Sequence, residues 1–372
     1  MYTNLLNSIK HSSLNVAKNV LESLLKEGAE PWVIHEALFP VVQSVLNPPF
    51  INPHLPKMYA INRELVGYLQ PEDVAMLVRV EVEEYARREK LKPIAPPSLL
   101  PSLSDFKEVE NAIAARDVLT TSGTLSAFLA KAGPLQLAKN LLILGSGYLD
   151  QSLGHSISCT AYLIIEMDIR KDEDPWPVLV SIAEYFCKGN FSQRPKMQYS
   201  AISDYPEVYL IDVKRAVSGT GIAPLHHTIT LYAIERSRHL LDQQEYDHLL
   251  TRWNKMLGDK GEDLIPSAEI ASQPVPEFDA FYQIFLESSP TKILALAKKS
   301  LDSKEERKRL AGLLIKAVLR SYNGYYNPHY LTGLGATVWV MERFPEQPDV
   351  VLTCLNQYLD FFFSNVDLSS KG

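Results

Sequence analysis

Cysteine is scarce in this chain, and its copies are scattered. The 372 residues include three cysteines, Cys159, Cys187 and Cys354, and no two of them form a Cys-x-x-Cys pair. A disulfide framework and a cysteine-rich zinc site both require clustered or paired cysteines, so the sequence excludes both classes. We therefore expect a reducing compartment.

Long hydrophobic runs and an excess of basic charge are missing as well. The longest apolar stretches, such as 161–165 and 39–46, are far shorter than the roughly 20 residues that a membrane span needs. The first 18 residues lack the basic start and apolar core of a signal peptide. Lysine and arginine total 37 against 44 acidic residues, a net charge of −7, so no basic face for a nucleic-acid backbone is expected. We predict a soluble cytoplasmic protein with no membrane span and no nucleic-acid partner; the sequence leaves its oligomeric state open.

Helical periodicity is what the sequence has in abundance. Leu14, Ala17, Leu21 and Leu24 recur at three- and four-residue steps, whereas strand-like alternation is brief everywhere and has one competitor, 205–213. The pattern predicts an all-α fold of helical hairpins. The predicted helices are 12–27, 31–46, 54–68, 71–92, 106–118, 124–131, 135–149, 155–168, 176–187, 206–217, 227–241, 243–256, 278–286, 290–301, 303–321, 329–343 and 348–363.

One segment has the composition of a linker. Residues 93–104 hold four prolines and three serines, which break helices and favour turns. We interpret this segment as a boundary between an N-terminal helical repeat region, 1–92, and a second helical region, 105–372. A boundary of this kind does not require two domains, and we expect one globular unit overall.

An internal repeat is visible near the two ends of the chain. A helix, a spacer, a second helix, an aromatic break and an Asn-Pro-His tripeptide occur in that order before His54 and again before His329. Two further segments, which begin GHSIS at His155 and HHTIT around His227, resemble the helix that follows the tripeptide. We predict four degenerate copies of one unit around a central pocket, three of them in 105–372.

The repeated histidines are the candidate catalytic and metal-binding residues. An imidazole in the first turn of a helix lies at the positive end of the helix dipole, which disfavours its protonation and leaves a nitrogen lone pair for a metal ion. The set is His54, His155, His227 and His329. We predict that these side chains converge and bind iron or another transition metal, or together polarise an organic substrate. The alternative is that repeated helices merely repeat their capping residues.

The sequence pattern also indicates which of two adjacent histidines belongs to this set and whether carboxylate motifs accompany it. Adjacent histidines cannot point the same way from a helix, and the repeat register favours His227 over His226. No Glu-x-x-His or His-Glu-x-x-His sequence occurs, so the carboxylate partners typical of di-iron bundles and zincins are absent from the pattern.

Neighbouring polar and aromatic residues are candidate substrate contacts. Thr230 and Thr332 lie three residues after their histidines and share a helical face with them. Tyr59 and Tyr232 occupy similar positions in the Met-Tyr-Ala-Ile and Leu-Tyr-Ala-Ile segments. These four residues would line a pocket suited to a flat aromatic molecule, although such side chains most often fill the core.

The motifs around three of the histidines resemble those of a known family. The segments NPHLPKM at 52–58, HHTITLYA at 226–233 and HYLT at 329–332 are similar to histidine motifs of the questin oxidase-like proteins, which are helical. The resemblance implies an oxygen-using, ring-cleaving oxidation of a polycyclic aromatic substrate, with NADPH as the reductant.

We therefore expect an oxidoreductase of the questin oxidase-like type that acts on an apolar small molecule. Two other classes remain open from the sequence. One is a metal-binding or haem-binding helical protein without oxidase activity. The other is a non-catalytic helical interaction or scaffold protein, in which the histidines would only cap helices.

Overall fold

The computed structural model describes residues 2–46, 51–97, 105–171, 173–189, 191 and 207–368. Regular structure in these ranges is helical, apart from an isolated bridge between Val45 and Lys90, so the predicted all-α class is confirmed. Among the helices of these ranges, none combines the length and the apolar character needed to cross a bilayer.

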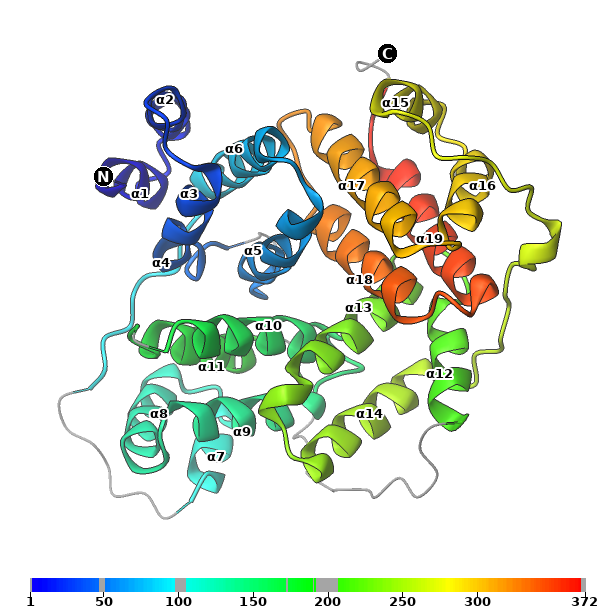
Figure 1. Ribbon diagram of the computed structural model, residues 1–372. Helices are drawn as coiled ribbons and strands as arrows, with labels where there is room; N and C mark the ends of the chain where they lie inside the picture. Colours follow the sequence, from blue (N-terminus) through cyan, green and yellow to red (C-terminus); the bar gives the residue numbers. More distant parts are fainter. Residues whose placement is uncertain are drawn as a thin grey trace.

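Four helices form the centre of the molecule (Figure 1). They are α5 (His54–Leu65), α10 (His155–Ile169), α13 (Ile222–Ser237) and α18 (His329–Arg343). Helix α10 packs against α5 and α13, and α18 packs against the same two helices, so the four close a ring. The first 12 residues of α10 and the first ten of α18 are buried on every side, as expected for helices with almost no charged residue there.

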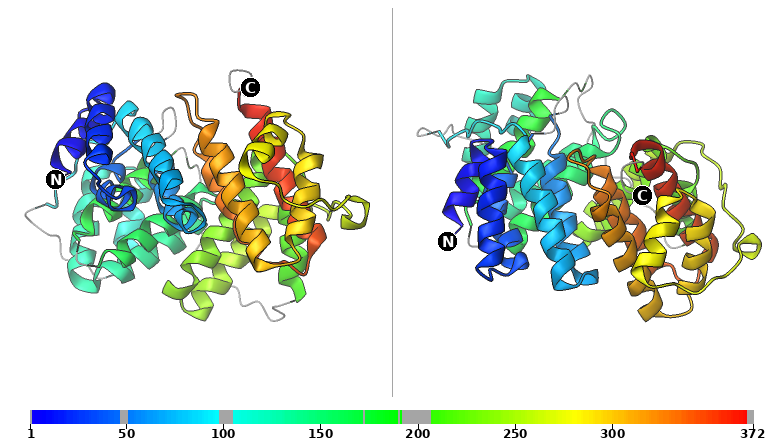
Figure 2. Two further views of the ribbon diagram at one scale, coloured as in Figure 1. Left: turned by 45° about the horizontal axis from the view of Figure 1, so that its top comes forward. Right: turned by 90° about the horizontal axis from the view of Figure 1, so that it is seen from above.

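The remaining helices cover this ring on several sides. In the two views of Figure 2, the blue N-terminal helices and the yellow helices near residue 290 lie at opposite ends of the molecule. The N-terminal cover consists of α1 (Thr3–Lys10), α2 (Leu14–Lys26), α3 (Pro31–Ala37), α4 (Phe39–Val42) and α6 (Pro71–Arg87). The cover that follows in sequence consists of α7 (Lys107–Ala114), α8 (Val118–Ala132), α9 (Pro134–Ser146), α11 (Trp176–Lys188), α12 (Glu207–Val217) and α14 (Gln243–Leu257).

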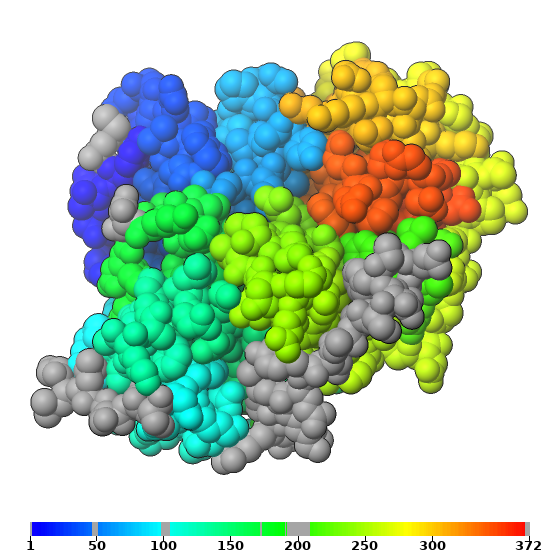
Figure 3. All heavy atoms as spheres, turned by 60° about the horizontal axis from the view of Figure 1, so that its bottom comes forward, coloured from blue at the N-terminus to red at the C-terminus, as the bar shows by residue number. Residues whose placement is uncertain are grey.

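The C-terminal helices pack against the N-terminal helices. They are α15 (Phe278–Leu286), α16 (Pro290–Ser300), α17 (Lys304–Arg320) and α19 (Pro348–Asn365), and short 3₁₀ turns occupy Val66–Tyr68, Arg238–Leu240 and Ser267–Glu269. Helix α17 packs on α6 although the two are far apart in sequence. Figure 3 shows the corresponding light-blue and orange surfaces in contact.

Most predicted helices are present, and the differences in their boundaries have local causes. The predicted helix 31–46 is split into α3 and α4 because Pro40 has no N–H to donate to the Glu36 carbonyl. That carbonyl accepts a hydrogen bond from Arg170 instead. Helix α8 begins earlier than predicted because the Asp117 carboxylate caps it by accepting from two backbone N–H groups. Helix α1 was not predicted.

Of the predicted linker 93–104, residues 98–104 lie outside the described residues. The described part, 93–97, has no regular secondary structure. The Ile94 carbonyl accepts a hydrogen bond from the Trp176 indole N–H, which attaches this segment to α11.

Ion pairs join the central helices beyond their first turns. Arg63 of α5 donates to Glu166 of α10 at 2.7 Å and also pairs with Glu36 of α3. On the other side of α5, Arg236 of α13 donates to Glu64 at 2.7 Å. Because these contacts fix the later turns of α5, α10 and α13 against one another, they also orient the first turns of the same helices.

Candidate metal centre

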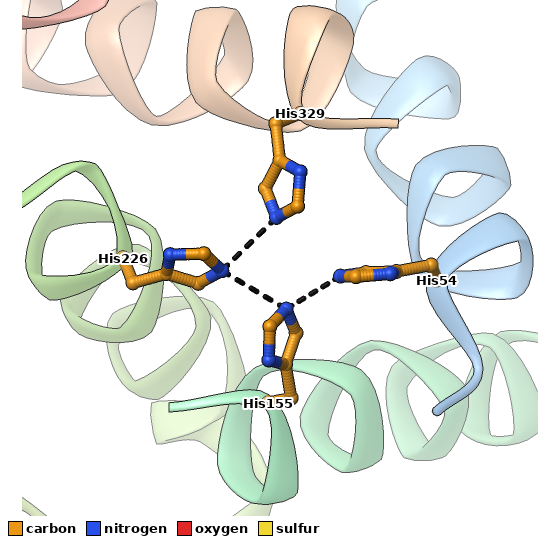
Figure 4. A group of neighbouring side chains, drawn as sticks. All are labelled: His54, His155, His226 and His329. Atoms are coloured by element: carbon orange, nitrogen blue, oxygen red, sulfur yellow. Dashed lines mark hydrogen bonds between the residues drawn. The ribbon is translucent and has the colours of Figure 1, made fainter. Parts of the chain in front are cut away.

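Four imidazole rings meet where the central helices begin (Figure 4). Each comes from a different helix, and all four are buried, with exposed fractions between 1% and 7%. One nitrogen from each lies within 4.8 Å of the nitrogens from the other three. We call these residues the four-histidine cluster: His54, His155, His226 and His329.

Local sequence explains why three of these histidines are the first residue of a helix. Pro53 and Pro328 precede His54 and His329, and a proline at the boundary fixes φ without removing a helical hydrogen bond. Gly154 precedes His155 in a left-handed conformation with φ of +81°, which favours glycine. Thus two proline boundaries and one glycine boundary each place an imidazole on the first turn.

The fourth member corrects the choice between the adjacent histidines. Helix α13 begins at Ile222, five residues before the predicted start, and Pro224 lies inside its first turn. Proline is tolerated there because the first N–H groups of a helix have no partner within it. The imidazole of His226 therefore faces the other three, whereas His227 does not belong to the cluster.

Three close contacts connect the Nε2 atoms. The distance is 2.5 Å between His54 and His155, 2.9 Å between His155 and His226, and 3.0 Å between His226 and His329. The dashed lines in Figure 4 follow these pairs around the cluster. All four rings thus present Nε2, and not a ring edge, to the shared centre.

Hydrogen bonds made by Nδ1 determine which ring nitrogen carries the proton in three of the four histidines. Nδ1 of His155 lies 2.6 Å from the Ser152 carbonyl oxygen, and Nδ1 of His226 lies 2.7 Å from that of Ile222. Carbonyl oxygens only accept, so both Nδ1 atoms donate. Nδ1 of His329 likewise donates to Oδ1 of Asn327 at 2.7 Å. In a neutral imidazole with a proton on Nδ1, Nε2 carries a lone pair and no proton.

Burial keeps these rings neutral. It is the main cause that lowers the pKa of His226 to about 3, and it lowers the pKa values of His54, His155 and His329 well below the usual range. Positive charge from the neighbouring Lys57 acts in the same direction on all four rings. The cluster is therefore a set of neutral nitrogen donors at neutral pH.

Two of the three close spacings between the nitrogens equal those of ligands at right angles. With metal–nitrogen bonds of about 2.05 Å, ligands at 90° lie about 2.9 Å apart and tetrahedral ligands about 3.3 Å apart. Two of the close contacts, 2.9 and 3.0 Å, match the 90° value, and the third is shorter than either. Within the described ranges no carboxylate or thiolate joins the group. The arrangement can hold one metal ion through four neutral nitrogens.

A haem does not fit this arrangement. The four in-plane nitrogens of a haem come from the porphyrin, and the protein adds axial ligands from above and below. Here four protein nitrogens lie within 4.8 Å of one another and surround a single point.

A buried polar layer lies one helical turn beyond the cluster. Lys57, Ser158 and Thr332 follow His54, His155 and His329 by three residues and are completely buried. Within the residues that the structure describes, the Lys57 ammonium has one hydrogen bond, to Oγ of Ser158 at 3.5 Å, and burial lowers the pKa of this lysine. The hydroxyl of Thr332 has no hydrogen-bond partner among the described residues.

The remaining predicted site residues take part in helix packing. The Thr230 hydroxyl donates to the His226 carbonyl at 2.7 Å. Tyr59 stacks on His35, with ring centroids 4.2 Å apart, and its hydroxyl accepts from Arg170. The Tyr232 hydroxyl donates to Glu64.

His227 makes its contacts outside the four-histidine cluster. Its backbone carbonyl accepts from the Trp253 indole N–H at 2.9 Å, and burial lowers the pKa of its imidazole to about 4. Of the four predicted substrate contacts, Thr332 alone has a polar group that finds no partner in the described part of the protein.

Three residues of this region were not predicted from the sequence: His226, Asn327 and Lys57. The signal for His226 was Gly221, because glycine often precedes a first helical turn that contains proline. Asn327 was visible as part of the Asn-Pro-His tripeptide, but only as a repeat marker. Lys57 was visible at the third position after His54, where it shares a face with the imidazole.

Known proteins offer no match from which a function for this site could be inferred. No protein-family model matches this chain, and neither a curated protein nor a solved structure matches it.

Proposed function

We propose that the four-histidine cluster binds one redox-active transition-metal ion and that this centre oxidises a small organic molecule. The observation that carries the proposal is the orientation of the bare Nε2 atoms. Three rings have their proton on Nδ1, yet their Nε2 atoms face one another at 2.9 and 3.0 Å. Facing lone pairs repel, and buried acceptors without a donor are destabilising. A metal ion at the centre satisfies all of them.

The donor set favours particular metals. Imidazole suits zinc, copper, iron and nickel, and zinc prefers tetrahedral ligands whose nitrogens lie about 3.3 Å apart. The two spacings of 2.9 and 3.0 Å support a tetragonal ion such as copper or nickel, or iron with open coordination positions. Copper and iron change oxidation state by one electron, which supports an oxidoreductase. A polycyclic aromatic substrate and NADPH rest on the resemblance to questin oxidase-like proteins alone.

A structural metal site is the second candidate. Structural sites have four protein ligands and little exposure, and the cluster has both features. Its ligands also come from segments that span residues 54 to 329, so one ion would join the first and last parts of the fold. In this case removal of the metal would lower stability and no oxidation would depend on it.

The first test is metal analysis of protein purified without a histidine tag. We expect about one transition-metal ion per chain, lost in His226→Ala and retained in His227→Ala, because only His226 presents Nε2 to the cluster. The two substitutions affect adjacent residues of one helix and remove the same group. Equal metal content in the two variants, or no metal in the wild type, would contradict the proposal.

The second test separates the enzyme from the structural site. Oxygen uptake by metal-loaded protein is measured with a panel of polyphenols and anthraquinones, with and without NADPH. The oxidoreductase predicts uptake that requires the metal and disappears in His226→Ala but persists in His227→Ala. A structural site predicts no uptake, together with a lower melting temperature after chelation.

A further inference from the structure

A metal ion in the four-histidine cluster would carry charge that its ligands do not neutralise. Four neutral imidazoles leave a divalent ion with its full charge, and in the described part of the chain no acidic group joins them. Helices α5, α10 and α18 also begin at the cluster, and helix N-termini repel cations and attract anions. An uncompensated buried charge is strongly destabilising, so a bound metal favours an anion beside it.

The polar layer beyond the cluster provides groups to hold that anion. Side chains of an α-helix tilt toward its N-terminus, so Lys57 and Thr332 lean toward the imidazoles one turn before them. Both are fully buried. Lys57 makes a single hydrogen bond at 3.5 Å, which leaves donor capacity unused, and the Thr332 hydroxyl has no partner within the described ranges.

Close packing of α5 against α18 limits the size of this ligand. One turn further along α18, a methyl group added at Gly335 would lie 2.5 Å from Cγ2 of Ile61, so α18 and α5 are in close contact there. Only about one helical turn, about 5 Å, separates that contact from the polar layer. Because α5 and α18 touch one turn beyond Lys57 and Thr332, we expect a compact anion and not an aromatic molecule on this side.

We propose that the metal ion binds a small anion as a further ligand, and that Lys57 and Thr332 hold this anion from the side opposite the metal. The chemical class is a compact anion of the size of hydroxide, azide or formate. This inference rests on the proposed metal site and adds to it a ligand and two positioning residues. Lys57 supplies a charge-assisted hydrogen bond and Thr332 a neutral one.

Azide binding to the copper-loaded protein tests the inference. Azide is titrated while the azide-to-copper charge-transfer absorption is recorded, in the wild type and in Lys57→Met, Thr332→Val and Thr337→Val. Methionine has about the length of lysine without the charge, and valine has the shape of threonine without the hydroxyl. Thr337 is the matched control, because it is a buried threonine of α18 whose hydroxyl already donates to the Gly333 carbonyl at 2.9 Å.

We expect one copper per chain in all four proteins and saturable azide binding in the wild type. Azide affinity falls about tenfold or more in Lys57→Met, since the lost hydrogen bond is charge-assisted, and by a smaller factor in Thr332→Val. It stays unchanged in Thr337→Val. Affinity in Lys57→Met within twofold of the wild type, with copper still bound, overturns the inference and leaves the metal site intact. A wild type that binds no copper, iron or nickel overturns both.

Discussion

At the level of single residues, the state of each imidazole depends on the oxygen that faces its Nδ1 atom. Ser152, Ile222 and Asn327 supply these oxygens to three of the rings. Two are backbone carbonyls and the third is a side-chain amide. Asn327 is therefore the one partner of this kind that a substitution can remove without changing the histidine itself.

Substitution of Asn327 should weaken the metal site without abolishing it. In Asn327→Ala, the Nδ1 atom of His329 loses its acceptor, so neither its proton nor its ring orientation is fixed any longer. Loss of such a partner typically lowers metal affinity by about 10- to 100-fold. Competition with a chelator of known affinity measures this change. Asn323→Ala is the control, since that side chain caps the nearby Tyr325 N–H and does not contact the cluster. Equal affinities in the two variants would contradict the role of Asn327.

The histidines show what a sequence can and cannot predict at this scale. The repeat around Asn-Pro-His identified His54 and His329, and the similar segment at Gly154 identified His155. The repeat register favoured His227 over His226, but helix α13 begins at Ile222, before the predicted start, and its first turns direct His226 to the cluster. A one-residue error rotates a helical side chain by about 100°, which is enough to select the wrong imidazole.

At the level of secondary-structure elements, the site depends on how closely the first turns of the helices approach. Gly154 shows this most clearly, since a methyl group on its Cα would lie 2.0 Å from the Thr230 hydroxyl of α13. Its φ of +81° already disfavours any other residue. The absence of a side chain therefore allows α10 and α13 to bring His155 and His226 together.

Gly154→Ala should be more destabilising than the same change at a glycine of similar φ in open space. Gly28 is such a position, with φ of +84°, the hydrogen bonds of a left-handed helix cap and nothing within 4 Å of an added methyl group. We expect Gly28→Ala to lower the free energy of unfolding by about 1–2 kcal/mol through backbone strain alone. Gly154→Ala should add about 1–3 kcal/mol for the clash and should also lower metal affinity. Urea unfolding of the two variants measures the difference, and equal losses would show that the approach of the helices is not tight.

Helix existence was easier to predict than helix boundaries. Apolar residues at three- and four-residue steps identified most elements, and 205–213, the one strand competitor, belongs largely to helix α12. The boundaries depended on single caps and prolines, as at Asp117 for α8 and Pro40 for α4. A cap acts through one or two hydrogen bonds, so its signal is weak beside the periodicity of a whole helix.

At the level of the whole molecule, the cluster exists because helices from distant parts of the chain close a ring. The Arg63 pairs with Glu36 and Glu166, and the Arg236 pair with Glu64, hold α5 against its neighbours. The sequence indicated that the histidine-headed helices are alike, but not which helices touch. Contacts between residues about 100 positions apart depend on side-chain packing, which a single sequence does not display.

Buried neutral histidines should make the metal-free protein sensitive to mild acid. Burial lowers the pKa of His226 to about 3 and that of His227 to about 4, and the other cluster histidines shift in the same direction. In the unfolded chain histidine titrates near 6.5, so below that pH the unfolded state binds more protons. The free energy of unfolding then falls by up to about 1.4 kcal/mol per pH unit for each such histidine.

Urea unfolding of metal-free protein between pH 7.5 and 5.5 measures this dependence. We expect stability to be complete above about pH 7 and to fall steadily below 6.5. His227→Gln should reduce the slope by about the share of one histidine, because glutamine does not titrate. A midpoint that stays constant over this range would contradict the burial of neutral imidazoles.

The proposed function requires that four imidazoles surround one metal ion. Diffraction from crystals of metal-loaded protein, recorded on both sides of the absorption edge of that metal, locates the ion directly. We expect one anomalous peak per chain, at about 2.0–2.1 Å from Nε2 of each residue of the four-histidine cluster. A peak coordinated elsewhere, or protein that gives no anomalous peak after exposure to copper, iron and nickel, would contradict it.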